Sequence, residues 1–121
     1  MKIAVPVDDK RLESGICPSF GRTPYFLIFN TDTNEACFLD NSAAASQGGA
    51  GIKAAQAIVD AEVNTLLTPR CGENAEEVLS KAEVLIYKTI SGTAQQNIDA
   101  YRAEQLLPLN EFHKGFHGHE K

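Results

Sequence analysis

The stretch at residues 48–79 decides the fold, and it reads GGAGIKAAQAIVDAEVNTLLTPRCGENAEEVL. It opens with three glycines that can adopt positive φ and bring bare backbone close to a ligand, namely Gly48, Gly49 and Gly51. Apolar residues then recur at the spacing of one helical face, at positions Ile52, Ala55, Ile58 and Val59. The pattern therefore predicts a glycine turn that leads into a helix.

A strand and a second helix follow in the same stretch. Residues 63–68 form a short apolar run that ends at Pro69. Next, Arg70-Cys71-Gly72 precedes a helix whose inward face is predicted to be Ala75, Val78, Leu79 and Ala82. Ligands of open α/β sheets bind at the loops that follow the carboxyl ends of strands, so Arg70 and Cys71 lie where chemistry is usually placed.

The rest of the chain predicts four more strands and one more helix. The β-rich runs are Lys2–Val7, Tyr25–Asn30, Glu35–Asp40 and residues 84–88, with a turn at residues 31–34. Thr93 to Gln96 matches a capping box that begins a helix with Ala94, Ile98 and Tyr101 on one face. The order βββαβαβα predicts an α/β fold with a three-layer arrangement around a mixed β-sheet. We expect one domain at residues 1–110 and a flexible, histidine-containing tail at residues 111–121.

Composition excludes several classes of protein. The chain has 121 residues, of which 43% are hydrophobic and 22% charged, a globular balance. A net charge of −5 argues against nucleic acid as a partner, so Asp8, Asp9 and Asp40 are expected to be solvated loop acids rather than nuclease carboxylates. No apolar run approaches the ~20 residues of a membrane span, and the chain enters a strand without a signal peptide's leader. We expect a cytoplasmic protein that does not contact membranes.

The glycine turn formally matches the dinucleotide pattern G-x-G-x-x-A at residues 49–54. It does not directly follow a strand, and the next strand ends without the acidic residue that binds ribose. The simplest interpretation is a helix start that needs close backbone packing. Backbone N–H groups at such a helix start also form an anion site, whatever the anion.

The three cysteines, Cys17, Cys37 and Cys71, are widely spaced and are expected to be reduced thiols. Cys71 lies beside Arg70 and ahead of a helix, where both influences lower a thiol pKa and favour the metal-binding thiolate. Glu73, Glu76 and Glu77 oppose that trend. The alternative is that Cys71 is a small apolar loop residue. Cys17, in the irregular loop at residues 8–24, either closes over the same edge or is merely shielded, and Cys37 is expected in the core.

Histidines at 113, 117 and 119 form the pattern H-x-x-x-H-x-H near the end of the chain. An ordered tail with this spacing would bind a divalent metal through His113, His117 and His119. Because the tail contains glycine and lacks a periodic apolar face, weak or incidental metal affinity is the favoured interpretation.

Four segments together resemble the dinitrogenase iron–molybdenum cofactor biosynthesis family, which includes NifX-like carriers, the C-terminal domain of NifB-like proteins and the small orange proteins. These segments are KIAVPV at residues 2–7, FGRTPYFLI at 20–28, GAGI at 49–52 and CGENA at 71–75. The resemblance implies a ribonuclease-H-like fold without nuclease activity and a role in binding, carrying or delivering a metal–sulfur cluster. Ser19 differs from the histidine that family members often have before the Phe-Gly-Arg segment.

The expected cargo is an iron–sulfur, iron–molybdenum or molybdenum–copper sulfide cluster, exchanged with donor and acceptor proteins. An anionic cluster requires N–H donors, guanidinium groups and a soft ligand, which Gly48 to Gly51, Arg22, Arg70 and Cys71 supply. We expect a binding protein without a catalytic step. Two alternatives remain: an enzyme or regulator that binds a phosphate-containing small molecule or nucleotide at the glycine turn, and a scaffold that works through protein contacts.

Overall fold

The structure is a computed structural model, and it describes residues 1–113. Within these residues the chain forms strands β1 (Lys2–Val7), β2 (Tyr25–Asn30), β3 (Glu35–Asp40), β4 (Thr65–Thr68) and β5 (Leu85–Lys88). The helices are α1 (Ala50–Asp60), α2 (Glu73–Lys81) and α3 (Ala94–Arg102), with a short 3-10 helix, η1 (Ser42–Ala45), before α1. The predicted order βββαβαβα is confirmed, and η1 is an addition to it.

In the described part of the chain, the strands form one mixed sheet in the order β3-β2-β1-β4-β5. β1 pairs antiparallel with β2 and parallel with β4, while β2–β3 is antiparallel and β4–β5 is parallel. The central strand β1 is buried from Ile3 to Val7, as expected for a strand that is covered on both faces.

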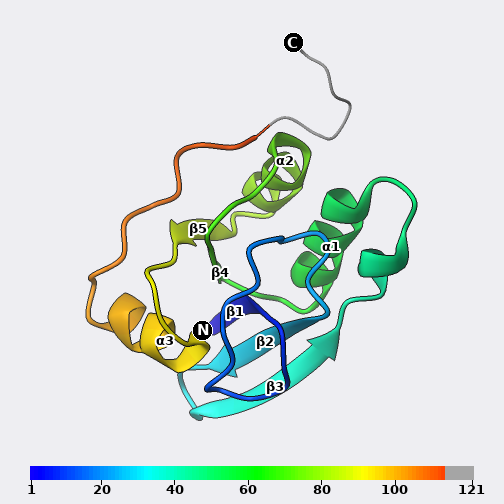
Figure 1. The fold of residues 1–121 in the computed structure, drawn as a ribbon. Helices are drawn as coiled ribbons and strands as arrows, with labels where there is room; N and C mark the ends of the chain where they lie inside the picture. The colour runs from blue at the N-terminus through cyan, green and yellow to red at the C-terminus, as the bar shows by residue number, and fades with distance from the viewer. Residues whose placement is uncertain (114–121) are drawn as a thin grey trace.

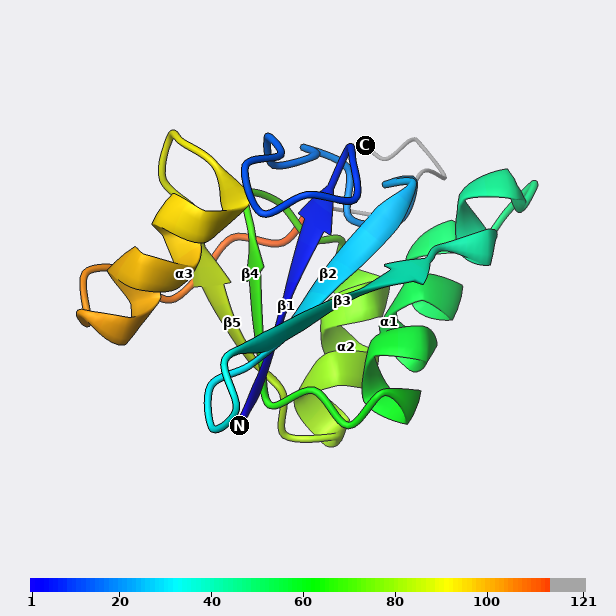
Figure 2. The same cartoon turned by 90° about the horizontal axis from the view of Figure 1, so that it is seen from below.

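The helices lie on both faces of the sheet and make a three-layer α/β domain (Figure 2). Alternate residues of β1 point to opposite faces, so Ala4 joins the apolar cluster under α1 and α2 while Ile3 and Val5 join the cluster under α3. The three-layer mixed α/β arrangement with a ribonuclease-H-like strand order is therefore confirmed.

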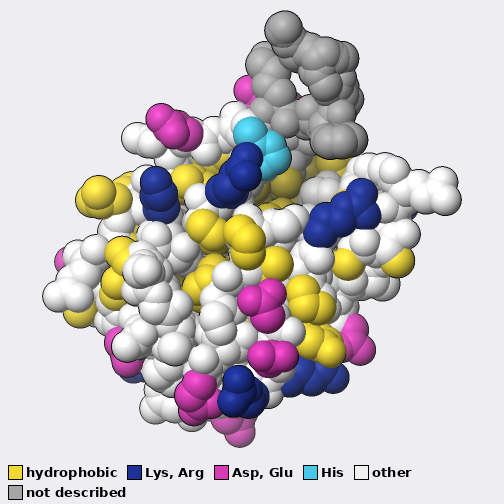
Figure 3. Space-filling view, in the orientation of Figure 1, with side chains coloured by type: hydrophobic (Ala, Val, Ile, Leu, Met, Phe, Trp, Pro, Cys, Tyr) yellow, Lys and Arg dark blue, Asp and Glu magenta, His cyan; other side chains and the backbone are white. Residues whose placement is uncertain are grey.

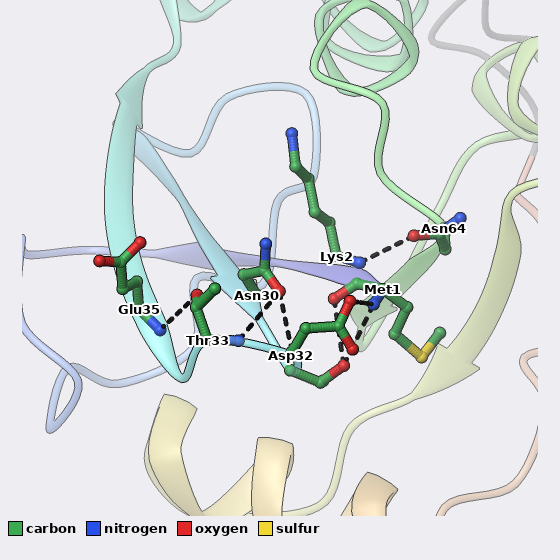
Figure 4. A network of polar contacts seen from close by, with 8 residues as sticks. Met1, Lys2, Asn30, Asp32, Thr33, Glu35 and Asn64 are labelled. Carbon is green, nitrogen blue, oxygen red and sulfur yellow. Dashed lines mark hydrogen bonds and ion pairs between the residues drawn. The ribbon is translucent and has the colours of Figure 1, made fainter.

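The turn at residues 31–34 lies at the end of the sheet opposite the carboxyl ends of β1 and β4, and Figure 4 shows its polar contacts. The side-chain oxygen of Asn30 accepts hydrogen bonds from the backbone N–H of Asp32 at 2.8 Å and of Thr33 at 3.4 Å. The backbone N–H of Lys2 donates to Asn64 Oδ1 at 2.7 Å, which joins β1 to the segment before β4. These local bonds confirm the predicted hairpin turn.

Residues 106–113, which we name the C-terminal strap, cover the outer edge of β5. Lys88 N–H donates to the carbonyl of Leu107 at 2.8 Å, and Leu109 N–H donates to the carbonyl of Ile86 at 3.0 Å. The strap then runs toward α2 (Figure 1), where Phe112 packs against the same apolar cluster as α2. The described part of the predicted tail, residues 111–113, thus makes contacts with the domain.

Three predicted burial assignments are wrong. Ile52 is 44% exposed, because Ala50, Ala54, Ala55 and Ile58 form the inward face of α1. Ala82 is exposed, because it lies just beyond the end of α2. Cys37 is exposed rather than part of the core, because β3 is an edge strand whose first three residues are exposed.

No helix among residues 1–113 is long and apolar enough to cross a membrane.

Candidate functional site

All three α-helices begin at the same end of the sheet, where the carboxyl ends of the parallel strands lie. β1, β3, β4 and β5 run in the same direction, so their carboxyl ends lie together there (Figure 2). The loop at residues 8–24 follows β1, and the starts of α1, α2 and α3 follow the other three strands. Open α/β sheets bind their ligands at this carboxyl end of the strands.

The first half of the 8–24 loop covers the start of α3. Ala94 N–H donates to the carbonyl of Ser14 and Gln95 N–H donates to the carbonyl of Leu12, both at 2.9 Å. The predicted capping box is also present, with Gln96 N–H donating to Thr93 Oγ1 at 3.1 Å. Because its first N–H groups already have partners, the start of α3 is not an anion site.

The second half of the same loop lies against the start of α1. A Cβ atom on Gly21 would be 2.9 Å from the backbone nitrogen of Gly51, so only glycine allows this approach. Asn41 fixes the loop from the other side, because its side-chain amide donates to the carbonyls of Gly21 at 3.1 Å and Thr23 at 2.9 Å. The Phe-Gly-Arg segment is therefore a docking element for α1.

The start of α1 presents backbone N–H groups without a side-chain cap. Its N-cap residue, Gly49, has φ +70°, and Gly48 and Gly51 do not need positive φ. Within residues 1–113, α1 has no acidic residue in its first turn, unlike α2. A Cβ on Gly51 would lie 3.6 Å from the Cβ of Ala75, so the first turns of α1 and α2 are adjacent. The helix dipole and these N–H groups favour an anion here.

The start of α2 is a weaker anion site than the start of α1. Its N-cap residue, Gly72, supplies no side-chain cap, but Glu73 and Glu76 lie in its first turn. Their carboxylates repel a nearby anion. The N–H of Glu73 also already donates to the carbonyl of His113 at 2.8 Å.

Cationic side chains flank both helix starts. Arg22 Nη1 donates to the carbonyls of Ala44 at 2.9 Å and Ser46 at 2.6 Å, so Arg22 fixes the segment that leads into α1. Lys53 Nζ donates to Ser46 Oγ at 3.2 Å on the same side. Arg70 is exposed in the loop before α2. Figure 3 shows basic side chains on this face, one group over α1 and another beside the histidine, with apolar side chains nearby.

Cys71 is buried as a neutral thiol. Its side chain belongs to the apolar cluster under α1 and α2, with 1% of the residue exposed. Burial, with a contribution from Glu76, raises the pKa of Cys71 to about 12. The thiol donates to the carbonyl of Gly72 at 3.6 Å. The predicted lowering of this pKa is wrong, because desolvation outweighs the helix dipole and Arg70.

Cys17 and His113 are the other predicted sulfur and histidine positions that the structure describes. Cys17 is buried at the end of β1, where its N–H donates to the carbonyl of Pro6 at 2.9 Å. His113 N–H donates to the carbonyl of Cys71 at 3.2 Å, which brings the strap to the site. His117 and His119 lie outside the described residues. Residues 1–113 contain no group of three or more His, Cys, Asp or Glu residues that could hold a metal ion.

Sequence reasoning missed Asn41, Lys53 and the strap. The sequence did indicate Lys53, because it follows Gly49 by one helical turn and so lies near the start of the predicted helix. Asn41 had none, because its partners Gly21 and Thr23 are 20 and 18 residues away in the chain.

The model of the dinitrogenase iron-molybdenum cofactor family matches residues 1–104. The apo form of the orange protein from Desulfovibrio gigas gives a TM-score of 0.86 at 27% identity, over 91% of this chain and 96% of that chain. A Thermotoga protein described as NifB gives 0.81 at 33% identity, over 93% and 97% of the two chains. A Methanocaldococcus jannaschii protein described as a dinitrogenase shares the fold, with a TM-score of 0.72 at 23% identity over 92% and 96%. No curated protein matches the sequence.

Proposed function

The chain belongs to the dinitrogenase iron-molybdenum cofactor family, and on that premise we propose that it binds an anionic metal–sulfur cluster and carries it during cofactor biosynthesis. Membership supports a role in making the iron–molybdenum cofactor. We further propose that the chain carries a cluster and exchanges it with donor and acceptor proteins. The type of cluster is also part of the proposal.

The observation that carries the proposal is the uncapped start of α1, with the start of α2 beside it. Gly49 directs the chain into α1, and no acidic side chain competes in the first turn. N–H groups at a helix start bind anions through hydrogen bonds and the helix dipole together. The sulfide surface of a cluster accepts hydrogen bonds weakly, so several such donors and nearby cations suit it better than one strong ligand.

The residues present fit a cluster that is held by hydrogen bonds and charge. Gly48, Gly49 and Gly51 supply backbone, Arg70 and Lys53 supply charge, and Arg22 holds the segment at residues 44–46 in place. Direct ligation by Cys71 is the competing version, and it requires removal of a proton from a buried thiol. In our proposal Cys17 and Cys71 are buried side chains that shield the site from solvent and do not ligate the cluster. The protein performs no catalytic step.

The test is anaerobic reconstitution with iron and sulfide, and separately with thiomolybdate and copper, followed by desalting, absorbance and metal analysis. We expect a stoichiometric chromophore with one of these mixtures. Arg70→Ala and Lys53→Ala should each lower retention several-fold, while Lys81→Ala, at the far end of α2, should leave it unchanged. Cys71→Ser should weaken retention only modestly.

Complete loss of the chromophore in folded Cys71→Ser would replace our version with direct thiolate ligation. Absence of a chromophore in wild-type protein with either mixture would contradict the carrier proposal. Stabilisation of the wild-type protein by nucleotides or phosphate would then favour the small-molecule alternative, because the same N–H groups bind phosphate.

A further inference from the structure

The C-terminal strap ends in a backbone clasp on the candidate site. His113 N–H donates to the carbonyl of Cys71 at 3.2 Å, and the carbonyl of His113 accepts from Glu73 N–H at 2.8 Å. The two bonds form a parallel bridge opposite Gly72. A Cβ on Gly72 would lie 3.2 Å from His113 Cε1, so the imidazole rests against this glycine.

The clasp already uses the backbone N–H of Glu73, a hydrogen-bond donor that a ligand of the site would otherwise bind. Glu73 is the first residue of α2, and its N–H points out of the helix start with no intrahelical acceptor. In the structure the carbonyl of His113 takes the place of an anion at this donor. A ligand that reaches the α2 side of the site must therefore displace His113.

The strap packs on the apolar cluster in which Cys71 is buried. Arg70 is exposed and Gly72 is partly exposed, yet Cys71 between them is 1% exposed. Leu109 and Phe112 of the strap belong to the same apolar cluster as Cys71. Residues from the end of the described chain thus bond to the backbone of Cys71 and Glu73 and share the apolar cluster of Cys71.

The outer part of the strap is anchored more lightly than the inner part. Leu109 is buried and bonded to β5, whereas Glu111 and His113 are exposed and Phe112 is only partly buried. Opening of residues 110–113 would break the clasp bonds and the Phe112 contact, but it does not require the bonds that join Leu107 and Leu109 to β5 to break. Segments with so few buried contacts open locally at lower free energy than the core.

We propose that residues 110–113 form a lid on the α2 side of the candidate site. This inference rests on the proposed function, because the lid would regulate access of the cluster to that site. The closed lid covers Cys71 and occupies the N–H of Glu73, and the open lid exposes both to the cluster. Leu109 is the fixed end about which the lid moves.

The test measures the alkylation rate of each cysteine in the full-length protein without any cluster, using pulses of N-ethylmaleimide and peptide mass spectrometry. Phe112→Ala removes the apolar contact, and His113→Pro removes the N–H that bonds to Cys71. Glu111→Ala is the matched control on the same strap. Exposed Cys37 and buried Cys17 serve as internal references for fast and slow reaction.

We expect Cys71 to react slowly in wild-type protein and Glu111→Ala, and at least tenfold faster in Phe112→Ala and His113→Pro, with Cys17 unchanged. Unchanged Cys71 rates in both lid variants would overturn the inference. An equal rise at Cys17 and Cys71 would also overturn it, since the variants would then loosen the whole fold. No cluster is present in this experiment, so failed reconstitution would contradict the proposed function and leave the lid result standing.

Discussion

The sequence neighbours of Cys71 and its burial in the fold have opposite effects on the pKa of its thiol. The start of α2 and the neighbouring Arg70 favour a thiolate. Burial in the apolar cluster favours the neutral form and raises the pKa from 9.0 to about 12, with Glu76 adding to the rise. The thiol is therefore protonated at neutral pH, which supports the proposal that the site relies on hydrogen-bond donors and cations rather than on a resident thiolate.

This pKa makes stability depend on pH in a defined window. Between pH 9 and 12 the unfolded state has lost the Cys71 proton while the folded state retains it, so the free energy of unfolding falls as pH rises. The loss approaches about 1.4 kcal/mol per pH unit. The contribution is fully present below pH 9, so the difference in stability between wild type and Cys71→Ala is constant there.

Urea denaturation of wild type and Cys71→Ala from pH 7 to 10.5 measures this effect as the difference between the two curves, which cancels other titrating groups. Cys37→Ala is the control, because Cys37 is exposed. Parallel curves for wild type and Cys71→Ala above pH 9 would contradict the neutral, buried thiol.

At the scale of elements, the 8–24 loop joins two helix starts. Its first half bonds to α3 and its second half packs on α1, so one irregular segment spans the carboxyl edge of the sheet. The result is an asymmetry among the helices. The start of α3 is closed by protein groups, whereas the start of α1 has no side-chain cap and no acidic residue in its own first turn.

Gly21→Ala tests the contact between the loop and α1. The added Cβ would lie 2.9 Å from Gly51 nitrogen and 3.1 Å from its Cα, where the helix backbone cannot yield easily. We expect a loss of about 1–3 kcal/mol in the free energy of unfolding, typical of an overpacked contact. Chemical denaturation of the purified variant measures it.

Gly48→Ala is the matched control, because a Cβ at Gly48 meets nothing within 4 Å. It should change stability by a few tenths of a kcal/mol, as for an open surface site. Equal effects of the two substitutions would show that the loop does not press on α1.

At the scale of the whole molecule, charge limits the partners. The chain carries a net charge of −5, and the Lys and Arg side chains visible in Figure 3 lie at separate positions rather than in one continuous patch. Cations at separate positions can hold a small anion, whereas a nucleic acid requires a continuous basic surface that neutralises many phosphates.

We therefore expect no micromolar binding to DNA or RNA at physiological salt, despite a fold shared with ribonuclease H. Fluorescence anisotropy with labelled single- and double-stranded oligonucleotides checks this, and incubation with magnesium checks for cleavage. Magnesium-dependent cleavage that disappears in Asp8→Asn would show a nuclease site and contradict the prediction.

The sequence by itself determined the order of elements, the hairpin turn, the cap of α3 and the placement of the glycine turn and Arg70-Cys71 after strands. Each of these depends on residues within a few positions of one another: the nearly continuous apolar run of β1, the Asn30 side chain at its own turn, and Thr93 with Gln96. Local geometry and periodicity are sufficient to specify such features, and the structure confirms the order, the turn and the cap.

Only the tertiary structure decided which of these groups are accessible and which are paired. Cys71 is buried in an apolar cluster that Leu109 and Phe112 of the strap also join. Cys37 is exposed because β3 is an edge strand, and Arg22 bonds to carbonyls 22 and 24 residues away. Burial and pairing depend on what other segments bring to a position, and no local pattern contains that information. The thiol pKa follows from the same cause, because desolvation belongs to the packed fold and not to the residue's neighbours in sequence.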